Sequence, residues 1–154
     1  MKYLFLAGFF FIVGSLYALS GAFAGLGVEV NANTREGAAF GGGLSAGLDI
    51  NSQFSFGLKT NFSSNFDAIS TLDIAGLFRY YLPFQFTGLF VQAELGTAVF
   101  FEDGKSYPAL LGGTAFGWRY NFLGNWYVEP CVRGGYPFIW GVGLITGYHF
   151  DLKK

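Results

Sequence analysis

Close to its C-terminus the chain carries the stretch Trp140-Gly-Val-Gly-Leu-Ile-Thr-Gly-Tyr-His-Phe150, in which large apolar residues alternate with small or polar ones. A period of two residues predicts a β-strand with two unlike faces. The same pattern recurs along the chain, and it predicts eight strands at 25–33, 40–50, 54–62, 71–81, 89–99, 110–120, 126–133 and 140–150. If the last strand pairs with the first, the sheet closes into a barrel and has no free edge.

The composition is unlike that of a water-soluble domain. Charged residues make up 12% of the 154 residues, whereas about 25% is typical, and aromatic residues make up 21%. Much of the surface must therefore face something other than water. The net charge of −1 and the lack of any Lys/Arg cluster exclude a nucleic-acid-binding protein. The single cysteine, Cys131, excludes an intramolecular disulfide and a cysteine-based zinc site.

The N-terminus reads as an export signal. Lys2 is followed by a long uncharged apolar run, and the small residues Ala22 and Ala24 form an A-x-A cleavage site. We expect residues 1–24 to be a cleaved signal peptide and residues 25–154 to be the barrel. The alternative is an uncleaved N-terminal membrane anchor, because the run nears the ~20 residues that a spanning helix needs.

The apolar face of the predicted barrel is expected to point outward. Eight strands enclose an interior only just wide enough for side chains, so the small residues belong inside and the bulky ones outside. The second face carries Lys59 as its only lysine, which would make a poor water-facing surface. Aromatic residues gather toward the strand ends in two rims, as in transmembrane barrels. One rim is Tyr80, Trp118, Tyr120, Trp126, Tyr148 and Phe150; the other is Phe62, Phe100, Tyr107, Tyr136, Phe138 and Trp140.

The chain end, Gly147-x-x-Phe150-x-Leu152, resembles the C-terminal signature of bacterial outer-membrane barrels. With the strand pattern, it makes the chain similar to the small eight-stranded barrels of the OmpA-domain, OmpX and opacity-protein type. The expected fold class is therefore all-β: an eight-stranded antiparallel up-and-down transmembrane β-barrel preceded by a cleaved signal peptide.

This resemblance implies a monomer in outer-membrane lipid, placed there by the barrel-insertion machinery. The insertion signal would be Gly147, Tyr148, Phe150 and Leu152. It also implies that both termini lie in the periplasm. The loops outside the cell would be Thr34–Gly37, Ser63–Ala68, Phe101–Pro108 and Gly134–Phe138.

Nine charged residues fall on the inner face by alternation, and we expect them to form a network that closes the lumen. They are Glu29, Asp49, Lys59, Asp73, Arg79, Glu94, Arg119, Glu129 and Arg133. A hairpin centred on Gly124 would set Arg119 opposite Glu129, and a two-residue register shift could set Lys59 opposite Asp73. Pro130 suggests a bulge that would reverse the facing of the residues after it. The alternative is that the charges hydrate a water-filled pore.

No catalytic or cofactor site is predicted. Barrel deacylases carry His-x-Ser on a strand, whereas the only histidine, His149, is followed by Phe150 and Asp151. The acidic residues are dispersed without metal-ligand spacing. The predicted function is an integral barrel with a structural or surface-interaction role through short loops. The alternatives are a narrow pore and a soluble, secreted, lipocalin-like ligand-binding barrel.

Overall fold

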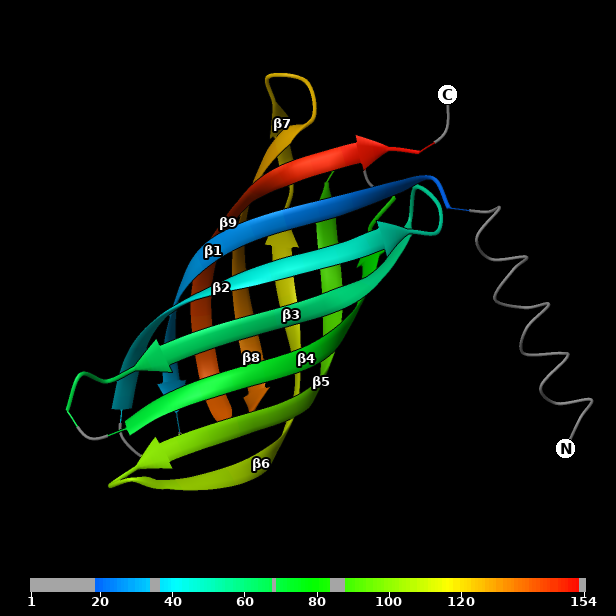
Figure 1. The fold of residues 1–154 in the computed structure, drawn as a ribbon. Helices are drawn as coiled ribbons and strands as arrows, with labels where there is room; N and C mark the ends of the chain where they lie inside the picture. The colour runs from blue at the N-terminus through cyan, green and yellow to red at the C-terminus, as the bar shows by residue number, and fades with distance from the viewer. Residues whose placement is uncertain (1–18, 34–36, 68, 84–87, 153–154) are drawn as a thin grey trace, which may run out of the picture.

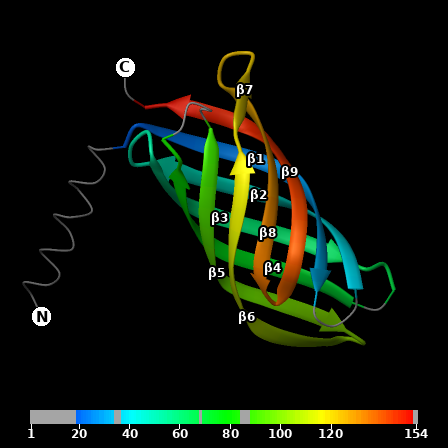
Figure 2. The same cartoon turned by 180° about the vertical axis from the view of Figure 1, so that it is seen from behind.

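The computed structural model describes residues 19–33, 37–67, 69–83 and 88–152, which form one closed antiparallel sheet (Figure 1). The strands are β1 (Gly21–Asn33), β2 (Gly37–Asp49), β3 (Phe54–Ser64), β4 (Ile69–Tyr81), β5 (Leu89–Glu102), β6 (Lys105–Trp118), β7 (Tyr120–Phe122), β8 (Trp126–Tyr136) and β9 (Phe138–Asp151). β1 pairs with both β2 and β9, and β6 pairs with β8, so the sheet closes on itself. Figure 2 shows β6, β8 and β9 side by side on the rear wall.

Strands β6 and β7 are one strand interrupted at Arg119, so the barrel has the eight strands predicted. Gly117 lies opposite Cys131 before the break and Tyr120 opposite Val128 after it, which is the same register. Pro130 has no N–H to donate to this ladder. On the other side of this strand, the N–H of Arg119 donates to the carbonyl of Gly88 at 2.8 Å and continues the pairing with β5.

The bulge suggested at Pro130 does not occur. β8 pairs with β9 in one unbroken register from Trp126 to Gly134. Arg133 therefore keeps the inward facing that simple alternation gives it, and it is 9% exposed.

Apolar side chains cover the outside of the barrel, as predicted. On β5, Leu95 is 66% exposed while its neighbour Glu94 is 5% exposed. Exposed aliphatic residues occur on most strands; they include Leu26, Val28, Leu44, Leu58, Ile74, Leu110, Val142 and Leu144. A continuous apolar surface of this kind matches lipid and would be unfavourable in water.

Two predicted loops are wrong because the strands run further than the apolar alternation indicates. In place of a loop at Phe101–Pro108, β5 and β6 are joined by Asp103 and Gly104, with φ values of +48° and +73°. Two residues with positive φ form a tight hairpin turn, for which Asp-Gly is a favoured sequence. In place of the loop at Gly134–Phe138, β8 reaches Tyr136 and β9 begins at Phe138.

The two ends of the barrel differ. β1 begins and β9 finishes at one end, beside the β7–β8 hairpin, and we call this the terminal end (Figure 1). The β3–β4 and β5–β6 connections lie at the opposite, far end. β1 begins at Gly21, four residues before the predicted mature start at Gly25. Of the other predicted loops, Thr34–Glu36 and Ala68 lie outside the described residues, as do residues 1–18 of the predicted leader.

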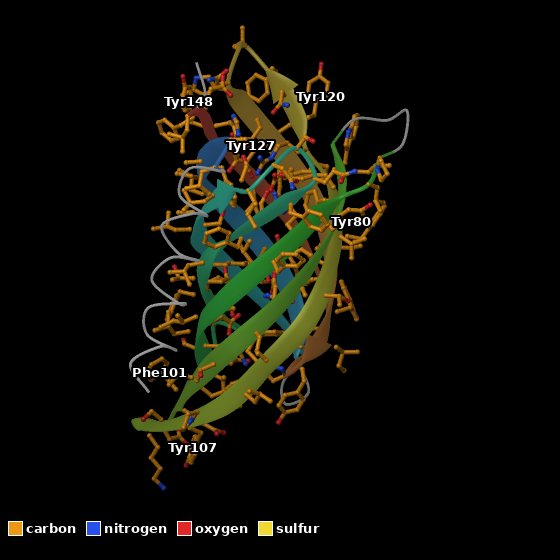
Figure 3. All side chains as sticks on the ribbon, turned by 90° about the vertical axis from the view of Figure 1, so that its right-hand side faces the viewer. Tyr80, Phe101, Tyr107, Tyr120, Tyr127 and Tyr148 are labelled. Carbon is orange, nitrogen blue, oxygen red and sulfur yellow. The ribbon has the colours of Figure 1, made fainter. Side chains whose placement is uncertain are left out.

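Aromatic residues gather at both ends. Figure 3 shows Tyr80, Tyr120 and Tyr148 toward the terminal end, and Phe101 and Tyr107 toward the far end. Three pairs of rings in the terminal rim are in contact: the ring centroids of Trp118 and Tyr120, Trp126 and Tyr148, and Tyr148 and Phe150 are 4.8–5.7 Å apart. Two residues assigned to the far rim lie inside the barrel instead, because Phe100 is 4% and Phe138 is 1% exposed. No helix in the described ranges is long and apolar enough to cross a membrane.

The barrel lumen as the candidate functional site

The structure places all nine predicted charged residues inside the barrel. Their exposed fractions range from 1% for Glu129 to 9% for Arg133. Strand alternation accounts for this, because side chains an even number of residues apart on one strand point to the same face. The charged residues therefore share the inner face with small residues of their own strands, such as Gly43, Ala75 and Gly113. The lumen is therefore the site to examine for function.

Glu129 is the centre of the first charge cluster, toward the terminal end. Arg79 donates to both of its carboxylate oxygens, at 2.7 Å from Nη1 and 3.1 Å from Nη2. Arg119 donates from Nε to Oε1 of Glu129 at 2.5 Å. Arg119 and Glu129 are therefore in contact, as expected for a hairpin centred on Gly124. Arg79 also donates from Nε to Gln92 at 3.0 Å and from Nη1 to the Tyr81 hydroxyl at 3.1 Å. We call Arg79, Arg119 and Glu129 the Glu129 cluster.

Aromatic rings enclose this cluster. The Arg79 guanidinium carbon lies 3.9 Å from the centre of the Phe90 ring, and that of Arg119 lies 4.2 Å from the centre of the Tyr127 ring. Phe23 packs with Tyr127 in the same layer, and both are at most 2% exposed. Cation–π contacts of this kind stabilise a guanidinium that is removed from water. The rings also fill the space through which a channel would have to pass.

A second cluster occupies the middle of the lumen. Lys59 Nζ lies 2.7 Å from Glu29 and 3.7 Å from Glu94, and Arg133 lies 2.5 Å from Glu29 and 3.0 Å from Glu94. Two bases and two acids thus form a ring of ion pairs, which we call the central cluster. Gln92 donates to Glu94 at 2.7 Å and accepts from Arg79, so the two clusters form one continuous network.

Asp73 is held more loosely than expected. Lys59 lies opposite Ala75, and Asp73 lies opposite Asn61, so the register that would join Lys59 to Asp73 is wrong. The nearest cation to Asp73 is Arg133, with Nη1 at 3.9 Å. Neither carboxylate oxygen of Asp73 makes a hydrogen bond within the described part of the protein.

An apolar layer fills the lumen beyond the central cluster, toward the far end, and we call it the plug. It consists of Ile69, Ala75, Ala98, Phe100, Leu111 and Phe138, each at most 4% exposed. Sequence reasoning missed this layer because Phe100 and Phe138 were grouped with the rim. The signal for Phe100 was present, since it is in phase with the inward residues Gln92, Glu94 and Ala98 on the same strand.

A third polar group lies at the mouth of the terminal end. His149 Nε2 is 2.6 Å from Asp49, and its Nδ1 is 3.3 Å from Asp151. Ser55 donates to the other carboxylate oxygen of Asp49. These contacts join the imidazole to carboxylates and not to a serine hydroxyl, so they do not form the nucleophile–base pair of a serine hydrolase. Within the described residues, no group of three His, Cys, Asp or Glu side chains could hold a metal ion.

The four residues of the predicted insertion signal lie at the end of β9. Gly147 is buried where the Tyr127 ring crosses the inner face, and a side chain there would collide with that ring. Tyr148 and Phe150 lie in the aromatic rim, and Leu152 follows the last strand residue with 53% of its surface exposed. Their role in insertion stays a prediction.

The fold resembles several solved structures. The N-terminal β-barrel domain of OprF from Pseudomonas aeruginosa aligns with a TM-score of 0.63 and 18% identity, over 85% of this chain and 97% of that one. Neisserial surface protein A aligns with a TM-score of 0.58 and 16% identity, over 86% and 96%. The outer-membrane protein OprG of Pseudomonas aeruginosa aligns with a TM-score of 0.54 and 11% identity, over 86% and 97%. No family profile and no curated protein matches the sequence.

Identities this low show a shared fold. They confirm the predicted fold class and the predicted resemblance to small outer-membrane barrels. The predicted outer-membrane localisation agrees with these neighbours and with the apolar outer surface. The fold is a closed, eight-stranded antiparallel β-barrel, similar to that of these small outer-membrane proteins.

Proposed function

We propose that the protein is an integral outer-membrane barrel with a closed lumen, whose role is structural or lies in contacts made by its short surface connections. The observation that carries this proposal is the order of layers inside the barrel. The aromatic layer around the Glu129 cluster, the central cluster and the plug follow one another from the terminal end to the far end. An ion would have to displace all three to cross.

The pore alternative requires a continuous water path. Seven of the nine lumen charges are paired with one another in the two clusters, and the plug side chains Phe100, Leu111 and Phe138 are at most 4% exposed. Eight strands leave little space beyond what these side chains fill. The soluble lipocalin-like alternative requires an apolar interior and a polar exterior, which is the reverse of the exposures on β5, where Leu95 faces outward and Glu94 inward.

The orientation follows from the resemblance to small outer-membrane barrels. With the termini in the periplasm, the far end faces outward. There it presents the two-residue turn at Asp103–Gly104 and the β3–β4 connection, in which Phe66 is 79% exposed. These connections are short, so any partner outside the cell would meet a small contact surface. We expect the protein to be inserted as a monomer and to catalyse no reaction.

Single-channel recording in planar bilayers tests the closed lumen. The purified, refolded protein is expected to give no large, steady conductance, while a general porin added to the same bilayer serves as the positive control. A stable conductance in every active membrane would refute the closed lumen and favour the pore. Recovery of the protein from the soluble periplasmic fraction would refute the membrane location itself.

A further inference from the structure

We propose that the leader is removed between Ser20 and Gly21, so that the mature chain begins at Gly21 and its new α-ammonium group lies between Asp49 and Asp151. This moves the processing site four residues upstream of the one expected from Ala22 and Ala24. Four features of the described residues lead to it.

The first feature is the pairing of residues 21–24. Gly21 lies opposite Asp49 on β2 and opposite Asp151 on β9, and Ala24 lies opposite Ala46 and Tyr148. β1 and β9 form the seam that closes the barrel. Removal of residues 21–24 would leave the last part of β2 and of β9 with free edges at this seam.

The second feature is Phe23, which a cut after Ala24 would remove. Its side chain is 2% exposed and packs with Leu77 and Tyr127. The guanidinium carbons of Arg79 and Arg119 lie 5.5 and 5.0 Å from its ring centre. Its loss would open a cavity beside two buried cations, which the surrounding residues can fill only in part.

The third feature is the distribution of small residues. A leader peptidase needs small residues one and three positions before the cut. Residues 18–24, at the end of the apolar run, offer three such pairs: Ala18 with Ser20, Ser20 with Ala22, and Ala22 with Ala24. Only the first keeps the whole of β1 in the mature protein.

The fourth feature is the charge around Gly21. Hydrolysis adds water across the Ser20–Gly21 peptide bond and leaves a carboxyl group on Ser20 and an amine on Gly21, which is protonated at neutral pH. Asp49 and Asp151 flank Gly21 in the sheet, and the imidazole of His149 contacts both carboxylates, at 2.6 and 3.3 Å. A Cβ on Gly21 would lie 2.6 Å from His149 Nε2 and 3.1 Å from Asp49 Oδ2, so glycine fits here and the ammonium group would lie close to both side chains.

The first experiment identifies the N-terminus directly. The full chain is expressed in a two-membrane bacterium, the outer membrane is isolated, and the protein is analysed by intact mass and by N-terminal sequencing. The expected sequence begins Gly-Ala-Phe-Ala. A start at Phe23 or Gly25, or an uncleaved chain, would overturn the proposal.

A matched pair of variants tests the cleavage motif. Ser20→Leu places a large residue immediately before the proposed cut, and Ala24→Leu does the same for the alternative cut at an exposed, outward-facing position. Ser20→Leu is expected to accumulate precursor in a pulse–chase experiment, whereas Ala24→Leu is expected to be processed like the wild type. Normal processing of Ser20→Leu at Gly21, or a block caused by Ala24→Leu, would contradict the proposed site.

Discussion

Replacing Glu129 by glutamine is expected to destabilise the folded barrel by about 3–5 kcal/mol, the range for removal of one partner from a buried ion pair. Glu129 is 1% exposed and accepts three hydrogen bonds from two guanidinium groups. Glutamine has nearly the same shape but removes the negative charge. Arg79 and Arg119 would then face each other in the lumen without a counter-charge.

Arg119→Met is expected to be milder, at about 1–3 kcal/mol, since it removes one charge-assisted hydrogen bond. Glu129 would keep both of its bonds to Arg79. The double variant should lose less stability than the sum of the two single variants, by about 0.5–3 kcal/mol, because the residues are in direct contact. Glu129→Gln is expected to lose more stability than Arg119→Met because Glu129 is the partner of two arginines, whereas Arg119 provides only one of them.

The assay is equilibrium unfolding of the detergent-refolded protein in urea, followed by the fluorescence of its three tryptophans. Asp67→Asn is the matched control, a carboxylate-to-amide change on an exposed connection, and should stay within about 0.5 kcal/mol of the wild type. If Glu129→Gln also stays within that range, or if Arg119→Met is the more damaging change, the network is not holding the lumen together.

Three further outcomes are expected. Leu95→Lys places a charge on the outer face and should destabilise the barrel in lipid by about 2–4 kcal/mol. If the variant is as stable as the wild type, Leu95 does not face the lipid. Ala98→Lys should be at least as harmful, because this residue is 0% exposed within the plug; unfolding midpoints of the two variants decide this. Gly104→Ala should destabilise the β5–β6 turn by about 1–2 kcal/mol, since φ is +73° there; an unchanged midpoint would argue against that turn.

Strand number, facing and the inward position of the charges could be predicted from the sequence because they depend on one local property. Successive side chains on a strand point to opposite faces, so Leu95 and Glu94 must separate wherever the strand lies. The composition of the two faces then indicates which one points outward, because bulky side chains do not fit inside a barrel of eight strands. The Arg119–Glu129 contact could also be predicted, because a tight hairpin fixes the register of its own two strands.

The strand ends could not be predicted in the same way. Alternation fades where a strand leaves the apolar layer, so the paired residues Glu102 and Lys105 looked like a loop. The turn at Asp103–Gly104 depends on backbone conformation, and an Asp-Gly pair favours that turn without requiring it.

Apart from the Arg119–Glu129 pair, the partners of the lumen charges were decided by the tertiary structure. Lys59 on β3 meets Glu29 on β1, and Arg133 on β8 meets Glu94 on β5, so strands that are not neighbours in the sheet exchange ion pairs across the lumen. Such contacts depend on how far each strand is shifted around the closed barrel, which is the sum of all the strand registers. The local pattern of the sequence determines which face each side chain takes, whereas only closure of the barrel determines which side chains meet inside it.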